Sequence, residues 1–278
     1  MLCWPRMGEA LGIYSNACLQ VAEVLRQYGF VWHTAQFKLV KKAGDLQLEF
    51  RFQSSHRNVV FNQPDAPPEL GSGARAPTLA THPSSPDRQD YAALFLPLET
   101  CLAEIAEFGS VTLIAHASVV SRGFKAWKRT KLNDAAANGT VAGANVGYLT
   151  PQRKWLEVNL AHSVFRSDRI VLLAALLESV GLPFFDRFLH PKEALHWMIE
   201  DNLPGQLAFS TLEYAHFLGG AEGASAVLLL LLRQMKVKGW DDEYHRALAE
   251  YRTHGIPDAV VATEGAMLAR TALMLDIE

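Results

Sequence analysis

The stretch LQLEFRFQ, from Leu46 to Gln53, alternates strictly between apolar and polar side chains. Because successive side chains of a β-strand point to opposite faces of a sheet, this alternation predicts a strand with one face against a core. The turn signal KAGD, residues 42–45, comes immediately before it, and an apolar-rich stretch, residues 30–41, precedes the turn. Two strands joined by so short a connection are typical of a β-hairpin. The sequence therefore predicts an antiparallel sheet in the first part of the chain.

Helical periodicity flanks this hairpin on both sides. Apolar residues recur every three or four positions over residues 10–28, which predicts an amphipathic first helix. The later stretches 110–120 and 146–162 indicate further strands, whereas the glycine- and alanine-rich residues 133–145 are predicted to be a connector. From Asp168 onward the pattern is helical. The expected fold class is therefore α+β: an N-terminal helix, a small antiparallel sheet of about four strands, and a helical C-terminal half.

This pattern predicts two regions in the chain. Residues 1–165 are expected to form the α+β sheet domain, and residues 166–278 a helical region packed on it. Residues 64–88 are rich in proline, glycine and serine and contain few apolar side chains. Such a segment cannot bury enough surface to offset the entropy of ordering it, so a flexible insertion is expected there.

Composition excludes some classes of function. The 278 residues carry a formal net charge of −3, whereas proteins that mainly hold nucleic-acid phosphates are usually strongly basic, so nucleic-acid binding is not expected. Cys3, Cys18 and Cys101 are too widely spaced for a metal pair or a disulfide framework, which favours a reducing, cytoplasmic location. The start of the chain lacks the features of a signal peptide. The most apolar run, residues 226–232, is too short to span a bilayer and is predicted to be a buried helix. No cofactor or metal site is expected.

The polar end of the first clear strand is the richest cluster of chemically useful side chains. Gln53, two serines, His56, Arg57 and an asparagine follow one another there. One interpretation makes His56 a general acid/base and Arg57 an anion clamp, as in a nuclease or phosphodiesterase. The other makes this a strand end whose polar groups bond to the loop backbone and to water. A recognition surface is an intermediate interpretation. His116 and His162 could join His56 on a sheet face, but nothing in the spacing requires it.

A basic segment, SRGFKAWKRTK, occupies residues 121–131. It interleaves cations, including Arg122 and Arg129, with Phe124 and Trp127. Aromatic side chains among cations can stack nucleic-acid bases, and Trp and Arg are also favoured at protein interfaces. The alternative is a solvated helix face with the two aromatic side chains buried beneath it.

Three short motifs in a fixed order carry a resemblance to a known family: YGF at 28–30, FQSS at 52–55 and GLPFFDRF at 181–188. With them, the chain resembles an uncharacterised bacterial domain-of-unknown-function family of α+β proteins over roughly residues 10–200. The resemblance implies no catalytic residues. It does imply a class of function, because small bacterial proteins of this kind are often immunity partners of polymorphic toxins.

Together these observations favour a non-catalytic protein-binding role, expected to be immunity to a bacterial toxin, with a protein partner and no membrane attachment. The first alternative is a hydrolase or nuclease acting on an anionic phosphodiester, with His56 as acid/base and Arg57 and Lys125 as anion clamps. The second is a structural or regulatory scaffold whose helical C-terminus forms a homodimer. The residues expected to contact the partner are Gln53, His56, Arg57, Arg122, Trp127 and Arg129.

Overall fold

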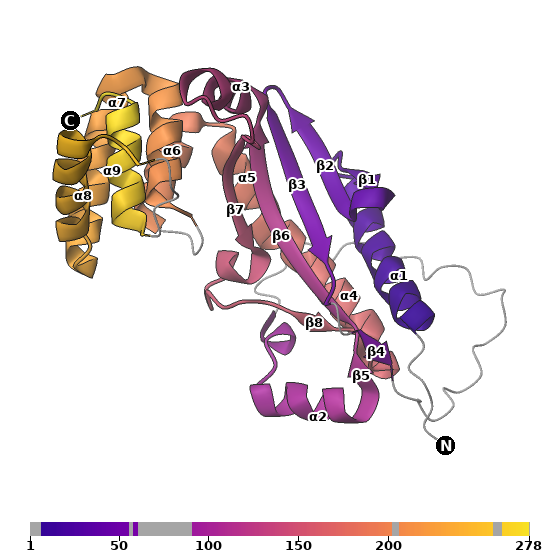
Figure 1. The fold of residues 1–278 in the computed structure, drawn as a ribbon. Helices are drawn as coiled ribbons and strands as arrows, with labels where there is room; N and C mark the ends of the chain where they lie inside the picture. The colour runs from indigo at the N-terminus through magenta and orange to yellow at the C-terminus, as the bar shows by residue number, and fades with distance from the viewer. Residues whose placement is uncertain (1–6, 56–57, 61–90, 202–205, 258–262, 278) are drawn as a thin grey trace. The chain divides into compact units, whose positions relative to one another are not determined.

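A computed structural model describes residues 7–55, 58–60, 91–201, 206–257 and 263–277 (Figure 1). The chain divides into two compact units, each built from three separate segments of the sequence. Unit 1 comprises residues 1–39, 51–115 and 154–180, and unit 2 comprises residues 40–50, 116–153 and 181–278. The expected flexible insertion, residues 64–88, lies outside the described residues.

The α+β fold class is confirmed. Within the described ranges the main sheet has six strands rather than about four, in the order β1-β2-β3-β6-β7, with β8 also paired to β6. The LQLEFRFQ stretch forms β3 with the predicted bounds, and Leu48, Phe50 and Phe52 of its apolar set are buried; Glu49, on the face predicted to be polar, is buried as well. Strands β2, β3 and β6 each contribute residues to both units. The strands of this sheet are β1 Val31–His33, β2 Lys38–Ala43, β3 Leu46–Gln53, β6 Thr112–Ser121, β7 Thr140–Asn145 and β8 Val158–Asn159.

Unit 1 contains three α-helices among its described residues. Helix α1, Met7–Arg26, matches the first predicted helix and packs against α4, Ser163–Leu176. Helix α2, Leu98–Phe108, directly precedes β5, Gly109–Ser110, which pairs antiparallel with β4, Val59–Val60.

The connector predicted at residues 133–145 is wrong in its second half, because Thr140–Asn145 form strand β7. Its side chains are small, so the sequence lacks the bulky alternation that marked β3. The small size has a packing reason: a side-chain carbon at Gly143 would lie 3.3 Å from the Cβ atom of Ser118, its partner on β6. Strand β7 therefore pairs closely with β6 at a point where only a small residue fits comfortably.

The helices of unit 2 follow β6 and fill the C-terminal half. The motif residues after Gly181 form α5, and the ring of Phe185 lies 4.8 Å from that of Phe50 on β3. The later helices enclose a core of their own, to which α6, α7, α8 and α9 all contribute. The bounds are α3 Arg122–Lys131, α5 Leu182–Phe188, α6 Pro191–Asp201, α7 Ala208–Lys238, α8 Asp241–His254 and α9 Glu264–Met274.

Helix α7 is two helices joined at Gly220. This residue has φ 63° and ψ −159°, a conformation adopted almost only by glycine. A side-chain carbon at Gly223 would lie 3.8 Å from the carbonyl oxygen of Ala215, whereas eight residues of continuous helix span about 12 Å. The chain therefore turns back at Gly220 and forms a helical hairpin (Figure 1).

The hairpin turn yields a sharp stability prediction. We expect Gly220→Ala to lower the free energy of unfolding by about 1–3 kcal/mol, because the added Cβ strains this backbone conformation. Gly219→Ala is the matched control: its φ is negative and a Cβ there would meet nothing within 4 Å. The control should be neutral or slightly stabilising. Urea unfolding curves compare the two variants, and equal behaviour would contradict a turn at Gly220.

One stretch of the described residues, Ala208–Met235, is long and apolar enough to cross a membrane when judged by length and composition alone. The turn at Gly220 divides it into residues 208–219 and 221–235, each shorter than the about 17 residues that a spanning helix needs. The run predicted to be a buried helix, residues 226–232, is buried on one face only. Leu228 is buried, whereas Leu229 is 62% exposed.

Candidate functional site

The basic segment forms helix α3, and the turn between β2 and β3 holds its N-terminus. The backbone N–H of Gly123 donates to the Asp45 carboxylate at 2.8 Å, and the Ser121 hydroxyl donates to the same carboxylate. The Ser121 Oγ atom in turn accepts from the backbone N–H of Phe124 at 2.9 Å. A carboxylate at a helix N-terminus is favourable because it satisfies free N–H groups and faces the positive end of the helix dipole.

The inner face of α3 is fixed by aromatic packing against α7. Phe124 is fully buried, and its ring lies 5.7 Å from Trp127 and 5.3 Å from Tyr214. Trp127 is half-buried and also contacts His216, at 5.4 Å between ring centroids. Burial is the main cause that lowers the pKa of His216, so its imidazole is favoured in the neutral form. The helix is thus anchored along its whole inner face.

The outer face of α3 is basic. Arg122, Lys125 and Arg129 are three and four residues apart, so they share one side of the helix. Arg122 and Arg129 are exposed and Lys125 is half-buried. The ten residues of α3 include five Lys or Arg and no acidic residue. Arg122 also donates to the carbonyl oxygen of Gly44 at 2.9 Å, which orients its guanidinium.

The structure groups only part of the predicted partner surface. Arg122 and Arg129 lie together on the outer face of α3. Trp127 lies on the inner face, as in the alternative interpretation with the aromatic side chains beneath a solvated face. Gln53 is exposed at the end of β3, in unit 1, whereas α3 belongs to unit 2. His56 and Arg57 lie outside the described residues, so the acid/base alternative that depends on them stays a prediction.

The histidines considered with His56 lie in different units. His116 is part of β6 in unit 2, and burial lowers its pKa, which favours the neutral ring. His162 precedes α4 in unit 1, where its ring lies 4.0 Å from Phe108 and 4.4 Å from Phe165. His162 therefore packs as an aromatic side chain. Throughout the ranges that the structure describes, no three His, Cys, Asp or Glu side chains are grouped to hold a metal ion.

A buried ion pair joins α3 to α7. The Lys128 Nζ atom lies 2.8 Å from Glu213 Oε2, and the side chains of this pair are only 15% and 8% exposed. Lys128 also approaches Asp134, at 3.9 Å. Burial raises the pKa of Glu213, and the bond to Lys128 partly opposes this shift. Sequence reasoning missed the pair; its one signal was a single acidic residue in the first half of α7.

Beside this ion pair lies a cavity of about 340 Å³, which we call the α9 groove. It lies between the end of α3, the first half of α7 and helix α9. Its apolar lining residues are Leu132, Phe209, Met267 and Met274. Its polar lining residues are Asn133, Asp134, Glu213, Arg270 and Thr271. The volume is within the range of small-molecule sites, which are typically apolar with a few polar groups.

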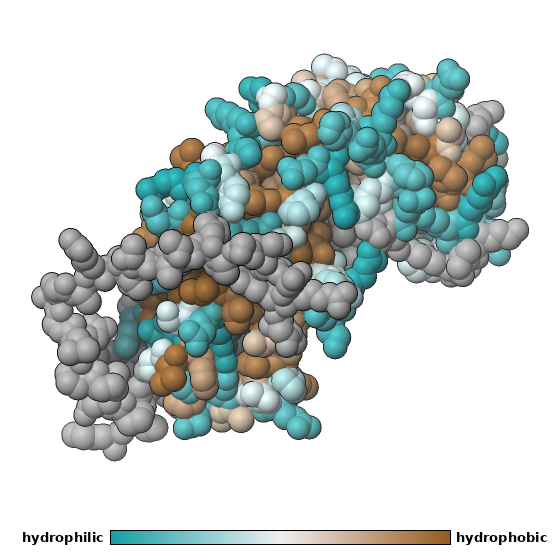
Figure 2. Space-filling model, turned by 180° about the vertical axis from the view of Figure 1, so that it is seen from behind, coloured by the Kyte–Doolittle hydropathy of each residue, from teal (hydrophilic) through white to brown (hydrophobic). Residues whose placement is uncertain are grey.

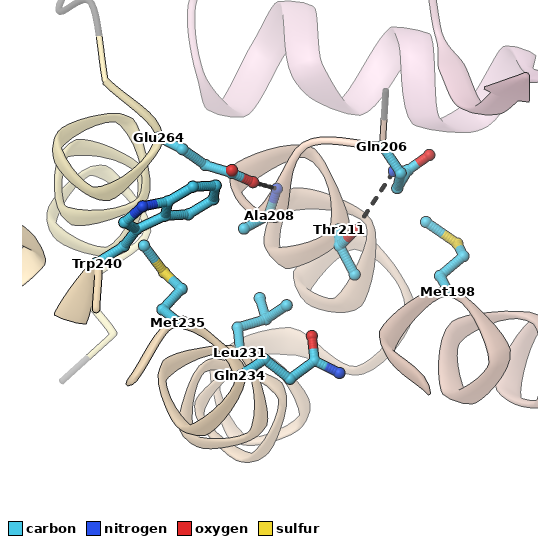
Figure 3. A pocket seen from close by; sticks show the side chains of 9 residues that line it. All are labelled: Met198, Gln206, Ala208, Thr211, Leu231, Gln234, Met235, Trp240 and Glu264. Atoms are coloured by element: carbon cyan, nitrogen blue, oxygen red, sulfur yellow. Dashed lines mark hydrogen bonds between the residues drawn. The ribbon is translucent and has the colours of Figure 1, made fainter. Parts of the chain in front are cut away.

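A second cavity in unit 2 is too small for such a role. Figure 3 shows its lining residues, among them Met198, Met235 and Trp240. Glu264 accepts a hydrogen bond from the backbone N–H of Ala208 at 2.8 Å and so caps the start of α7. The cavity volume of about 20 Å³ holds about one water molecule. These residues therefore connect helices and do not form a ligand site.

Unit 1 exposes an apolar stripe on α2. Leu98, Leu102 and Ile105 share one side of the helix and are 72%, 57% and 40% exposed. The other side is held by Glu104, whose Oε1 atom lies 2.5 Å from Arg169 on α4. Apolar patches also appear between polar side chains on the face shown in Figure 2. Exposed apolar side chains that cluster often mark interaction surfaces.

A comparison of the chain with protein-family models, with curated proteins and with solved structures found no match. The resemblance carried by the three short motifs therefore stays a prediction.

Proposed function

We propose that the protein is a non-catalytic, cytoplasmic binding protein that places the outer face of α3 against an acidic surface of a partner protein. Helix α3 carries this proposal, because it presents Arg122, Lys125 and Arg129 from a backbone that is fixed at its N-terminus and along its inner face. Side chains held on a rigid element lose less conformational freedom on binding. Arginine is enriched at protein interfaces, where its planar guanidinium pairs with carboxylates.

A protein partner fits this surface better than a nucleic acid does. The cationic face is confined to one ten-residue helix, and the whole chain carries a net charge of −3. Nucleic-acid binding usually depends on several phosphate contacts and a clear basic bias. The apolar stripe of α2 is a further surface of the kind that proteins use to bind one another.

Toxin immunity is the narrower form of this proposal. It rests on the resemblance of the YGF, FQSS and GLPFFDRF motifs, and it makes the partner a toxin domain with an acidic surface. Such a partner is expected to be encoded beside this chain, so the products of the adjacent genes are the first candidates to test.

Neutralising the outer face of α3 should weaken this complex. We expect the double variant Arg122→Gln, Arg129→Gln to lower the affinity for the partner at least about tenfold, since each arginine forms a charge-assisted contact. Co-expression with each adjacent gene product, followed by co-purification and calorimetric titration, measures the effect. The wild-type affinity should also fall with added salt.

The matched control is Lys192→Gln, Arg246→Gln, which removes two exposed cations from α6 and α8. It should bind the partner like the wild type. Equal affinity of both double variants would overturn the role of α3. A partner that is not a toxin would overturn the immunity form alone. Salt-sensitive binding of duplex DNA or RNA, lost in the α3 variant, would replace the proposed partner class with a nucleic acid.

A further inference from the structure

The α9 groove combines two opposite charges with an apolar lining. Asp134 follows α3, and Arg270 belongs to α9, so the two charges come from different elements around one cavity. The apolar side chains of Leu132, Phe209, Met267 and Met274 line the same cavity. A site of this composition can orient a ligand by its charged groups and hold its apolar part by contact with the lining.

The two carboxylates of the groove share one neighbouring cation, Lys128. Lys128 lies 2.8 Å from Glu213 and only within 3.9 Å of Asp134, so its ammonium group mainly neutralises Glu213. Asp134 Oδ1 also accepts the backbone N–H of Ala136 at 3.0 Å, a bond that leaves its negative charge in place. Arg270 makes no ion pair within the described part of the chain. A single ammonium group cannot neutralise both carboxylates, so one negative charge and the Arg270 guanidinium can still pair with a ligand.

We propose that the α9 groove binds a zwitterionic small molecule with an apolar body, of the class of free apolar α-amino acids. Arg270 receives the ligand carboxylate through paired N–H donors, because a planar guanidinium matches a carboxylate bidentately. Asp134 receives the ligand ammonium. The apolar side chain contacts Phe209 and the methionines, whose flexible thioethers adapt to ligands of different shape. This site goes beyond the proposed function, since the outer face of α3 takes no part in it.

The charge assignment excludes simpler ligands. A cation would be attracted to Asp134 but repelled by Arg270, and an anion would meet the reverse. A neutral apolar molecule would leave both charged groups partly desolvated and unpaired, which costs free energy. Only a molecule that carries both charges pairs with both groups.

Calorimetric titration of the full chain with three related probes tests this assignment. L-leucine carries both charges, leucinamide lacks the carboxylate, and N-acetyl-leucine lacks the ammonium. We expect L-leucine to bind at least about tenfold more tightly than either analogue, because each analogue loses one charge-assisted contact. Arg270→Gln and Asp134→Asn should each weaken L-leucine binding at least about tenfold. Arg270→Gln should leave the weaker binding of leucinamide unchanged.

Two further variants make the result decisive. Arg270→Lys keeps the cation and should retain most of the affinity, which separates loss of charge from loss of fold. Arg246→Gln removes an exposed cation from α8 and should bind L-leucine like the wild type. The proposal is overturned if the wild type does not bind L-leucine up to its solubility limit. It is equally overturned if N-acetyl-leucine binds as tightly, or if Arg270→Gln has no effect.

Discussion

Replacing Phe124 with alanine is expected to lower the free energy of unfolding by about 3–5 kcal/mol. The Phe124 ring is fully buried and contacts the rings of Trp127, Tyr214 and Phe217 at 5.3 to 5.7 Å between centroids. An isolated helix of ten residues is marginal in water, so α3 depends on this packing for its order. Urea unfolding measures the loss of stability. Hydrogen exchange of residues 124–131 reports whether α3 itself opens.

Two controls separate packing from other effects of substitution in α3. Phe124→Leu keeps much of the apolar volume and should cost about 1–2 kcal/mol. Arg129→Ala changes the solvated face of the same helix and should remain within about 0.5 kcal/mol of the wild type. If Phe124→Ala and Arg129→Ala unfold alike, the aromatic packing does not hold α3, and its outer face would not be the rigid surface that partner binding requires.

The sequence predicted the strands and helices that show a clear pattern of apolar and polar side chains over consecutive residues. The alternation from Leu46 to Gln53 produced β3 with the expected bounds, because Leu48, Phe50 and Phe52 are buried whereas Arg51 and Gln53 on the other face are exposed. Glu49 departs from this pattern, since it is buried on the face predicted to be polar. Strand β7 was missed because its residues are small: Gly143 and its neighbours carry no bulky side chain, and their role is to let β6 and β7 approach. That role depends on a partner strand far away in the sequence, and no local pattern records it.

The candidate site also has one part that the sequence could predict and another that it could not. The cationic spacing of Arg122 and Arg129 is a property of ten consecutive residues, so the sequence alone could indicate a basic surface there. Trp127 lies on the inner side of α3 because α7 packs there, and α7 is far from α3 in the sequence. The pairing of Lys128 with Glu213 and the meeting of Asp134 with Arg270 around one cavity depend on tertiary packing. These groups could be found only once the helices were placed.

Replacing Arg169 with methionine is expected to lower the free energy of unfolding by about 3–5 kcal/mol, because it leaves a buried carboxylate without its partner. The side chains of Arg169 and Glu104 are only 8% and 12% exposed, and their charged atoms lie 2.5 Å apart. Arg169 also donates to the carbonyl oxygen of Asn159 at 2.7 Å. Urea unfolding measures the loss, and hydrogen exchange of residues 98–108 should show α2 opening first.

The double variant Glu104→Leu, Arg169→Met supplies the control, because replacing both charges removes the unpaired carboxylate. It should recover most of the lost stability but not all, since the Asn159 carbonyl still loses its donor. Equal destabilisation of the single and double variants would mean that the charge pair does not hold α2. This comparison shows what attaches α2 to unit 1, because Leu98, Leu102 and Ile105 on the other side of the helix are exposed. The helix gains little from burying them within unit 1, so the Glu104 side must supply its attachment.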